Sequence, residues 1–210
     1  MEPKNAINDY GNMTMKTINN ILPFDGIAEY FPNAIIKEQA DTLFHSLLST
    51  IQWENDIVSM FGKTHVMSRK SAWYGDKGCT YTYGSVVHKP LPWTSDLVQC
   101  KQLAESIAEK TFNSCLCNLY HSGIEGMGWH SDDEKELGIN PDIISLSFGA
   151  DRIFRFQHNK TKECIDILLA HGSILHMHGQ CQHHWKHALP KSRKIVDARI
   201  NLTFRYIHQL

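Results

Sequence analysis

The sequence predicts a mainly β fold with α-helices packed against one side, and three observations support this prediction. The first half contains two segments with apolar residues at helical spacing. The second half contains short β-branched or alternating runs, broken by Gly, Asn or Pro about every ten residues. No helical pattern separates these runs, which favours an antiparallel sandwich or small barrel over alternating β-α units.

The composition is typical of a globular protein of 210 residues, with 42% hydrophobic and 20% charged residues. A chain of this length suits one domain with a substantial core. We expect residues 1–22, which are polar and rich in asparagine, to be an N-terminal extension to one domain formed by residues 23–210. The formal net charge of −1 means that nucleic-acid binding would require a local basic patch.

The cysteines and the lack of long apolar runs predict an intracellular protein. None of the six cysteines forms a CxxC pair. The first residues lack the apolar run of a signal peptide, and no stretch approaches the roughly 18 apolar residues of a membrane span. We therefore expect a soluble, reduced protein with no membrane partner, in the cytoplasm if bacterial and the nucleus if eukaryotic.

Two helices are expected in the first half. Residues 33–51 place Leu43, Phe44, Leu47, Leu48 and Ile51 at helical spacing. The second helix lies in residues 95–112, with Ser95 or Asp96 as its N-cap. Its inner stripe is expected to contain Leu97, Leu103, Ala104 and Ile107.

Five strand-like segments follow: residues 115–121, 143–149, 152–158, 164–177 and 198–207. Before the second of them, the stretch GMGWHSDDEKELG at residues 126–138 places His130 next to four acids. On an extended segment, residues i and i+2 point to the same face, so His130 and Asp132 would converge on one ion. A solvated run of charges would explain the acids but not the histidine.

A third metal ligand is expected from a histidine cluster, CQHHWKHALP, which contains His183, His184 and His187. Two histidines and one carboxylate form the triad of non-haem Fe(II) oxygenases, which leaves coordination positions open for a co-substrate and O₂. A structural or adventitious zinc site is the alternative that these residues leave open.

The last predicted strand supports the oxygenase interpretation. Arg199, Asn201, Thr203 and Arg205 share one face, and the other carries Ile200, Leu202, Phe204 and Tyr206. A strand with its polar face in solvent would show the same pattern. Two inward-facing arginines, however, would be costly unless an anion neutralised them. Because their Cα atoms are about 20 Å apart on an ideal strand, one ligand would meet them at its opposite ends. A dicarboxylate such as 2-oxoglutarate satisfies this geometry.

Three segments, NLYHSGIEGMGWHSDDE, HHWKHALP and RINLTFR, occur in an order that resembles the AlkB family of Fe(II)- and 2-oxoglutarate-dependent dioxygenases. The similarity runs from about residue 55 to the C-terminus. The segments FGKTH, RKSAWYGDKG and YTYG also resemble members that act on duplex DNA. The resemblance implies a double-stranded β-helix, or jelly-roll, core with buttressing helices, and a nucleotide-recognition lid at about residues 55–90.

The resemblance also implies roles for individual residues. His130, Asp132 and His187 would be the catalytic iron ligands, whereas His183 and His184 are not family ligands. Arg199 would pair with the distal carboxylate of 2-oxoglutarate. The co-substrate site would be completed by Asn118, Tyr120, Asn201, Thr203 and Arg205.

A substrate site is implied in the first half of the chain. Phe61, Gly62 and Lys63 could form an apolar wedge on a turn with a phosphate-binding lysine. A hairpin with Phe61 turned into the core is the alternative from spacing alone, but the resemblance implies that Phe61 fills the gap left by a flipped base. The base would stack between Tyr83 and His130, and Asp133 would accept a hydrogen bond from its exocyclic amine. The remaining implied substrate contacts are Arg69, Tyr81, Thr82 and Glu134.

Local charge agrees with a nucleic-acid partner. Residues 186–205 contain six Lys or Arg and one acid, Asp197. With Arg199 and Arg205 set aside as buried, Lys186, Lys191, Arg193 and Lys194 remain for phosphates. An ordinary soluble surface with the same patch is the alternative.

The expected function is direct-reversal DNA repair by a monomer. Oxidation of N1-methyladenine or N3-methylcytosine in duplex DNA, with Fe(II), 2-oxoglutarate and O₂, would release formaldehyde and restore the base. Two other functions stay open. The same chemistry could act on RNA, a protein or a small molecule, or the chain could be a non-catalytic, zinc-containing nucleic-acid-binding module.

Overall fold

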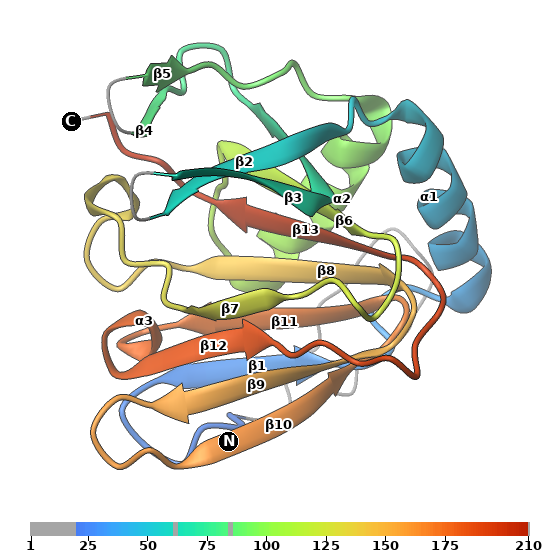
Figure 1. Ribbon diagram of the computed structural model, residues 1–210. Coiled ribbons are helices and arrows are strands. Elements are labelled where there is room, and N and C mark those ends of the chain that lie inside the picture. Colours follow the sequence, from blue (N-terminus) through green and yellow to red (C-terminus); the bar gives the residue numbers. More distant parts are fainter. Residues whose placement is uncertain (1–19, 61–62, 84–85, 210) are drawn as a thin grey trace.

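A computed structural model shows two main antiparallel β-sheets and a separate two-stranded hairpin, with two long helices on one side (Figure 1). The structure describes residues 20–60, 63–83 and 86–209. Around its two internal gaps, at residues 56–60, 63–67, 81–83 and 86–88, it describes the backbone only. The greater part of the expected N-terminal extension, residues 1–19, lies outside the described residues.

The larger sheet has seven strands in the order β1-β11-β8-β13-β6-β3-β2. All of its pairings are antiparallel. These strands are β1 (Ile27–Phe31), β2 (Glu54–Met60), β3 (Lys63–Gly75), β6 (Ser114–Tyr120), β8 (Ile143–Gly149), β11 (Ser173–His178) and β13 (Arg199–Arg205).

The smaller sheet has four antiparallel strands in the order β10-β9-β12-β7. They are β7 (Met127–His130), β9 (Arg152–His158), β10 (Cys164–Leu169) and β12 (Trp185–Leu189). A separate hairpin pairs β4 (Tyr81–Tyr83) with β5 (Val86–His88).

Helices α1 (Lys37–Thr50) and α2 (Ser95–Ala108) cover the outer face of the larger sheet (Figure 1). The short helices are η1 (Lys135–Leu137), after β7, and α3 (Cys181–His184), directly before β12. The predicted fold, mainly β with buttressing helices around a jelly-roll core, is confirmed. No helix among the described residues is long and apolar enough to cross a membrane.

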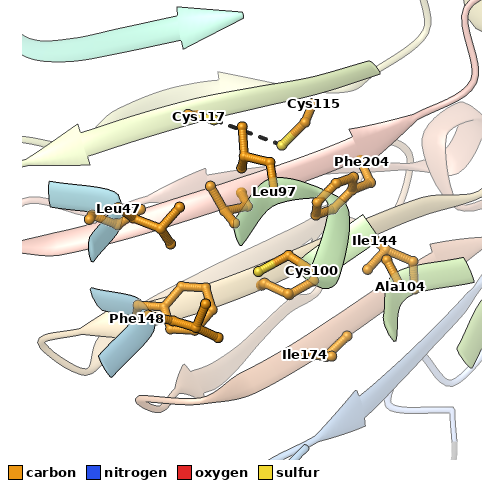
Figure 2. Packing of buried hydrophobic residues seen from close by; sticks show 14 of the residues in the cluster. Leu47, Leu97, Cys100, Ala104, Cys115, Cys117, Ile144, Phe148, Ile174 and Phe204 are labelled. Atoms are coloured by element: carbon orange, nitrogen blue, oxygen red, sulfur yellow. Dashed lines mark hydrogen bonds between the residues drawn. The ribbon is translucent and has the colours of Figure 1, made fainter. Parts of the chain in front are cut away.

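Strand alternation sorts the side chains of β13 onto two faces. On the outer face, Ile200, Leu202 and Phe204 are fully buried in the core beneath the helices, with Leu47 of α1 and Leu97 of α2 (Figure 2). The residues that alternate with them point the other way and line a cavity between the two sheets. They are Arg199, Asn201, Thr203 and Arg205. Burial of the apolar face therefore determines which polar side chains point inward.

The helix boundaries and the cap of α2 differ from the prediction. Helix α1 begins at Lys37, four residues later than the start of the predicted segment. The N-cap of α2 is Thr94 rather than Ser95 or Asp96, and its side chain accepts a hydrogen bond from the N–H of Leu97 at 3.3 Å. Ser95 already belongs to the helix, so the preceding threonine is the residue positioned to cap it.

The segment 164–177 forms two strands rather than one. The chain turns between β10 and β11, which belong to different sheets. Gly172 has φ of +74°, and a Cβ atom there would lie 2.6 Å from the carbonyl oxygen of Ile35. The turn thus needs glycine for both its backbone conformation and its close approach to the segment before α1.

Candidate active site

Strand pairing brings together the two histidines for which the sequence predicts a metal-binding role. His130, the last residue of β7, lies directly opposite His187 of β12 in the antiparallel register. Their ring centroids are 4.3 Å apart. Asp132 follows two residues after β7, and its Oδ1 lies 4.0 Å from Nε2 of His130. One ligand atom from each of the three residues lies within 4.8 Å of the others, so the group can hold a metal ion.

The backbone of the segment around β7 orients the first histidine. Nδ1 of His130 is 2.8 Å from the carbonyl oxygen of Gly128, which accepts a hydrogen bond from the ring when Nδ1 carries the proton. That tautomer leaves the Nε2 lone pair facing Asp132. Just before β7, a Cβ atom at Gly126 would lie 2.4 Å from the carbonyl oxygen of Leu189. Glycine therefore allows the chain to approach β12 closely.

Asp132 is held by two polar contacts and is only 4% exposed. Its Oδ2 accepts a hydrogen bond from Nη2 of Arg205 at 2.9 Å. Its backbone N–H donates to Oε1 of Gln182 in α3 at 3.0 Å. The contact with Gln182 was not predicted, because nothing in the sequence separates this glutamine from a surface residue.

The electrostatics of this group suit a bound cation. Burial favours the neutral acid at Asp132, but Arg205, His187 and His130 outweigh it and lower the pKa of Asp132. Burial lowers the pKa of His187 to about 3. At neutral pH, Asp132 is thus a carboxylate and His187 a neutral imidazole, the protonation states that a metal ion requires.

A cavity of about 190 Å³ contains this group and extends between the two sheets. All nine residues that the sequence predicts for metal and co-substrate lie along it. Its lining residues are Leu116, Asn118, Tyr120, Met127, His130, Asp132, Glu134, Ser145, Phe154, Met177, His187, Leu189, Arg199, Asn201, Thr203 and Arg205.

Arg199 is a buried cation, 1% exposed. Among the described residues it forms no ion pair, and its Nε has no hydrogen-bond partner. Its Nη2 donates to the neutral oxygens Ser147 Oγ at 2.9 Å and Asn201 Oδ1 at 2.7 Å. Burial lowers the pKa of Arg199 to about 10, which still leaves it charged at neutral pH. A buried cation with a free donor fits an anionic ligand.

A short polar network holds this arginine in place. Asn201 accepts from Arg199 and also from Ser145 Oγ at 3.0 Å, and its Nδ2 donates to Thr203 Oγ1 at 2.7 Å. Ser145 and Ser147 of β8 were not predicted as site residues. The alternation ISLS within IISLSFG was the available signal, because it places two hydroxyls on one face of a strand that pairs with β13.

Arg152 is a second buried arginine that sequence reasoning missed. It is 1% exposed, and its Nη2 donates to the carbonyl oxygens of Glu125 at 2.8 Å and Pro190 at 3.0 Å. It thereby ties the segment before β7 to the segment after β12. Its guanidinium carbon lies 5.8 Å from the ring centroid of Tyr120, a cavity residue that also faces Arg199 at 5.6 Å.

The predicted substrate residues are described only in part. Phe61 and Gly62 lie outside the described residues, and for Lys63 and residues 81–83 only the backbone, in β3 and β4, is described. Arg69 of β3 is buried. Of the two acids that follow Asp132, Glu134 lines the cavity and Asp133 is exposed.

The other histidines of the CQHHWKHALP cluster do not join this group. His183 is exposed, and His184 belongs to a separate cluster with Asp25 and His158. The donor set at the cavity, two imidazoles and one carboxylate, fits a ferrous ion. The buried cation Arg199 on the same cavity fits the carboxylate of a co-substrate.

Comparison with known proteins places this site in a class. The family model described as the 2OG-Fe(II) oxygenase superfamily matches residues 28–205. Enzymes of this class use Fe(II), 2-oxoglutarate and O₂. The solved structure of OsALKBH1 has the same fold, with a TM-score of 0.61 and 14% identity over 85% of this chain and 96% of that one.

Curated relatives narrow the class further. The chain is 38% identical over 182 residues to bovine DNA oxidative demethylase ALKBH2, covering 81% of this chain and 66% of the relative. The chain is also 38% identical to the mouse protein of that name, and the match covers 81% of this chain and 76% of the relative. It is 35% identical over 188 residues to human alpha-ketoglutarate-dependent dioxygenase alkB homolog 3, covering 85% and 65%. The chain belongs to the AlkB family of the 2OG-Fe(II) oxygenase superfamily.

Proposed function

We propose that this protein repairs DNA by oxidative demethylation of N1-methyladenine and N3-methylcytosine. The observation that carries the proposal is a cavity that contains a His-Asp-His group at one position and the buried cation Arg199 at another. The substrate class follows from similarity to relatives named DNA oxidative demethylase, which extends over 81% of the chain.

The cavity residues would divide the catalytic work among themselves. His130, Asp132 and His187 would bind Fe(II), and Arg199 would bind the distal carboxylate of 2-oxoglutarate. When bound, iron and 2-oxoglutarate supply the oxidation of the N-methyl group by O₂, with conversion of 2-oxoglutarate to succinate and CO₂. Oxidation leaves an N-hydroxymethyl group on the base. Loss of formaldehyde from this group restores the unmodified base.

The remaining cavity side chains would position these groups and exclude water. Asn118, Tyr120, Asn201 and Thr203 line the space between the metal group and Arg199, and would contact the co-substrate. Arg205 holds Asp132 in place through the 2.9 Å contact. The apolar walls, which include Leu116, Phe154, Met177 and Leu189, would limit access of water to the reacting atoms.

The proposed DNA partner is a duplex with the methylated base flipped out, bound by one copy of the protein. His130 is 35% exposed, so one side of the metal group is accessible from outside. We propose that Phe61 fills the gap left by the base and that Lys63 contacts the DNA backbone. Arg69 and residues 81–83 would contact the flipped nucleotide. Asp133 and Glu134 would accept hydrogen bonds from the exocyclic amine.

An exposed basic segment supports binding to phosphates. Lys191, Arg193 and Lys194 are exposed between β12 and β13, the strands that carry His187 and Arg199. Lys186 of β12 lies over the ring of Trp129, with Nζ 5.3 Å from its centroid. Contacts between lysine or arginine side chains and phosphates fix the position of DNA without reading its sequence.

The test is formaldehyde release from matched oligonucleotides that carry one methylated base, in single-stranded DNA, duplex DNA and RNA. We expect turnover on both DNA forms with Fe(II), 2-oxoglutarate and O₂. Phe61→Ala should reduce turnover on duplex more than on single strands, and Leu168→Ala, at a half-exposed site on β10, should change neither. An equal loss on both DNA forms would reject the wedge. Absence of turnover on DNA would reject the proposed substrate, and turnover on RNA alone would replace it.

A further inference from the structure

A second cluster of potential ligands lies on the opposite face of the larger sheet from the cavity. Its members are Glu29 of β1, His176 and His178 of β11, and Asp142 just before β8. Strand alternation places both histidines on the same face as Ile174, which packs in the core beneath the helices. Met177, between them, lines the cavity. The sheet therefore separates this cluster from the proposed iron site.

The distances within the cluster suit a metal ion better than direct hydrogen bonds. Glu29 lies opposite His176 in the antiparallel register. Oε2 of Glu29 is 3.7 Å from Nδ1 of His176 and 3.4 Å from Nε2 of His178. Hydrogen bonds between N–H and O are about 2.7–3.2 Å long. Ligand atoms at the corners of a tetrahedron around zinc, with bonds of about 2.0–2.2 Å, are roughly 3.3–3.6 Å apart.

Neither of these ring nitrogens forms a hydrogen bond to any described residue. His176 is 4% exposed, and its Nδ1 is fully buried without a hydrogen bond to any described residue. The same holds for Nε2 of His178. The two rings stack with centroids 4.3 Å apart and planes 21° from parallel, so both nitrogens approach the same carboxylate. Buried polar atoms rarely remain unsatisfied, and a cation between them and Glu29 would satisfy both.

Asp142 supplies the supporting contact that metal-binding histidines usually have. Its Oδ1 lies 2.9 Å from Nε2 of His176. A proton on that nitrogen, donated to Asp142, leaves the Nδ1 lone pair directed at the cluster.

A cluster of similar composition elsewhere in the chain lacks this arrangement. Asp25, His158 and His184 also lie within reach of one another. There, however, Nδ1 of His158 accepts a hydrogen bond from the backbone N–H of Thr161 at 3.1 Å. Its proton is therefore on Nε2, which is also buried without a hydrogen bond and lies 3.3 Å from Oδ2 of Asp25. The difference is that this proton occupies the nitrogen that a metal would need. This cluster serves as a control.

We propose that Glu29, His176 and His178 bind a zinc ion, at a site distinct from the iron site of the proposed function. Two imidazoles and one carboxylate are ligands that suit zinc, and the half-exposed Glu29 leaves a fourth position accessible to water. The ligands come from two paired strands, and β1 is the edge strand of its sheet. Bound zinc would fasten this edge strand to β11.

The experiment measures zinc bound to the full-length, tag-free protein after removal of metals and dialysis against micromolar Zn(II) with a weak chelator. Because the iron ligands also bind zinc, the parent is the variant His130→Ala/Asp132→Ala. We expect about one equivalent per chain in the parent and a rise in its melting temperature on zinc addition. Glu29→Gln and His178→Ala, each added to the parent, should lose both effects. His184→Ala, in the control cluster, should keep both.

A second measurement tests the proposal even if the double variant misfolds. In the otherwise native chain, zinc should fall from about two equivalents to about one on Glu29→Gln, with an unchanged circular dichroism spectrum. Zinc binding that survives both Glu29→Gln and His178→Ala would overturn the proposal. An equal loss of zinc in His184→Ala would also overturn it. A third contradicting result would be no zinc bound to the parent together with only one equivalent bound to the native chain.

Discussion

Arg205 and Asp132 form an ion pair at the wall of the cavity, with Nη2 of the arginine 2.9 Å from Oδ2 of the carboxylate. The other oxygen of Asp132, Oδ1, is the one nearest to His130. One oxygen thus contacts the arginine while the other remains directed at the proposed metal position. Asp132 and Glu134 outweigh the effect of burial on Arg205, and its pKa is raised. The arginine therefore stays charged and keeps Asp132 ionised and oriented.

Arg205→Gln should weaken both folding and metal binding, because it leaves the Asp132 carboxylate buried without its partner. Loss of one partner of a buried pair costs about 3–5 kcal/mol, and loss of a supporting contact lowers metal affinity about 10–100-fold. Denaturant unfolding of the metal-free protein and anaerobic Fe(II) titration measure the two effects. Arg155→Gln removes an exposed pair with Asp166 and should cost less than about 1 kcal/mol. Similar small effects in both variants would count against the positioning role of Arg205.

Arg199→Met should weaken binding of 2-oxoglutarate by at least about 30-fold, since truncating one partner of a buried charge pair costs about 2–5 kcal/mol. The native protein should prefer 2-oxoglutarate strongly over 2-oxobutyrate, which lacks the distal carboxylate. The variant should lose most of this preference. Anaerobic titration of the iron-loaded protein with each acid gives the ratio, and a preference that survives in the variant would place the distal carboxylate elsewhere.

Gln182→Leu should lower iron affinity although this side chain does not belong to the metal group. The substitution leaves the buried N–H of Asp132 without its acceptor, which costs about 1–3 kcal/mol. Gln182→Glu keeps an acceptor oxygen and should recover much of the affinity. Gln180→Leu, at an exposed site two residues earlier, is the matched control. The same Fe(II) titration compares the three variants, and equal affinities would show that Gln182 has no influence on Asp132.

Thiol modification should distinguish one cysteine from the other five. All six are free, and only Cys164 is exposed. Burial raises the pKa of Cys181 to about 12 and raises the pKa of Cys79, Cys100 and Cys115, so these thiols form little thiolate at pH 8. A chromogenic disulfide reagent should react rapidly with about one thiol in the native protein and with all after denaturation. The fast phase should disappear in Cys164→Ser, and a fast phase that persists would contradict this packing.

The alternation in RINLTFR predicted that its apolar residues and its arginines lie on opposite faces of β13, but it left open whether the polar face meets solvent or a cavity. Its apolar residues could be buried only beneath the helices, so the arginines had to face the other sheet. His130 and Asp132 were predictable as a pair because two residues on an extended segment share a face. The choice of His187 from its cluster required the family resemblance, since spacing alone did not separate it from His183 and His184.

The supporting residues were not predictable in the same way. Gln182 and Arg152 act through backbone groups that are close only in the folded chain. No local pattern reveals that a glutamine in α3 will meet the N–H of Asp132, 50 residues away in sequence. The cluster of Glu29, His176 and His178 depends likewise on the register of β1 with β11. Periodicity indicates the face on which a side chain lies, but partners across strands depend on tertiary pairing.

Succinate and formaldehyde, measured together from an oligonucleotide that contains one N1-methyladenine, test whether the His-Asp-His group and Arg199 act in one reaction. We expect both products to form in about equal amounts with Fe(II), 2-oxoglutarate and O₂, because each demethylation consumes one co-substrate. His187→Ala should form neither product while its circular dichroism spectrum stays native. Formaldehyde release that persists in a folded His187→Ala protein, or that does not require 2-oxoglutarate, would contradict the proposed function.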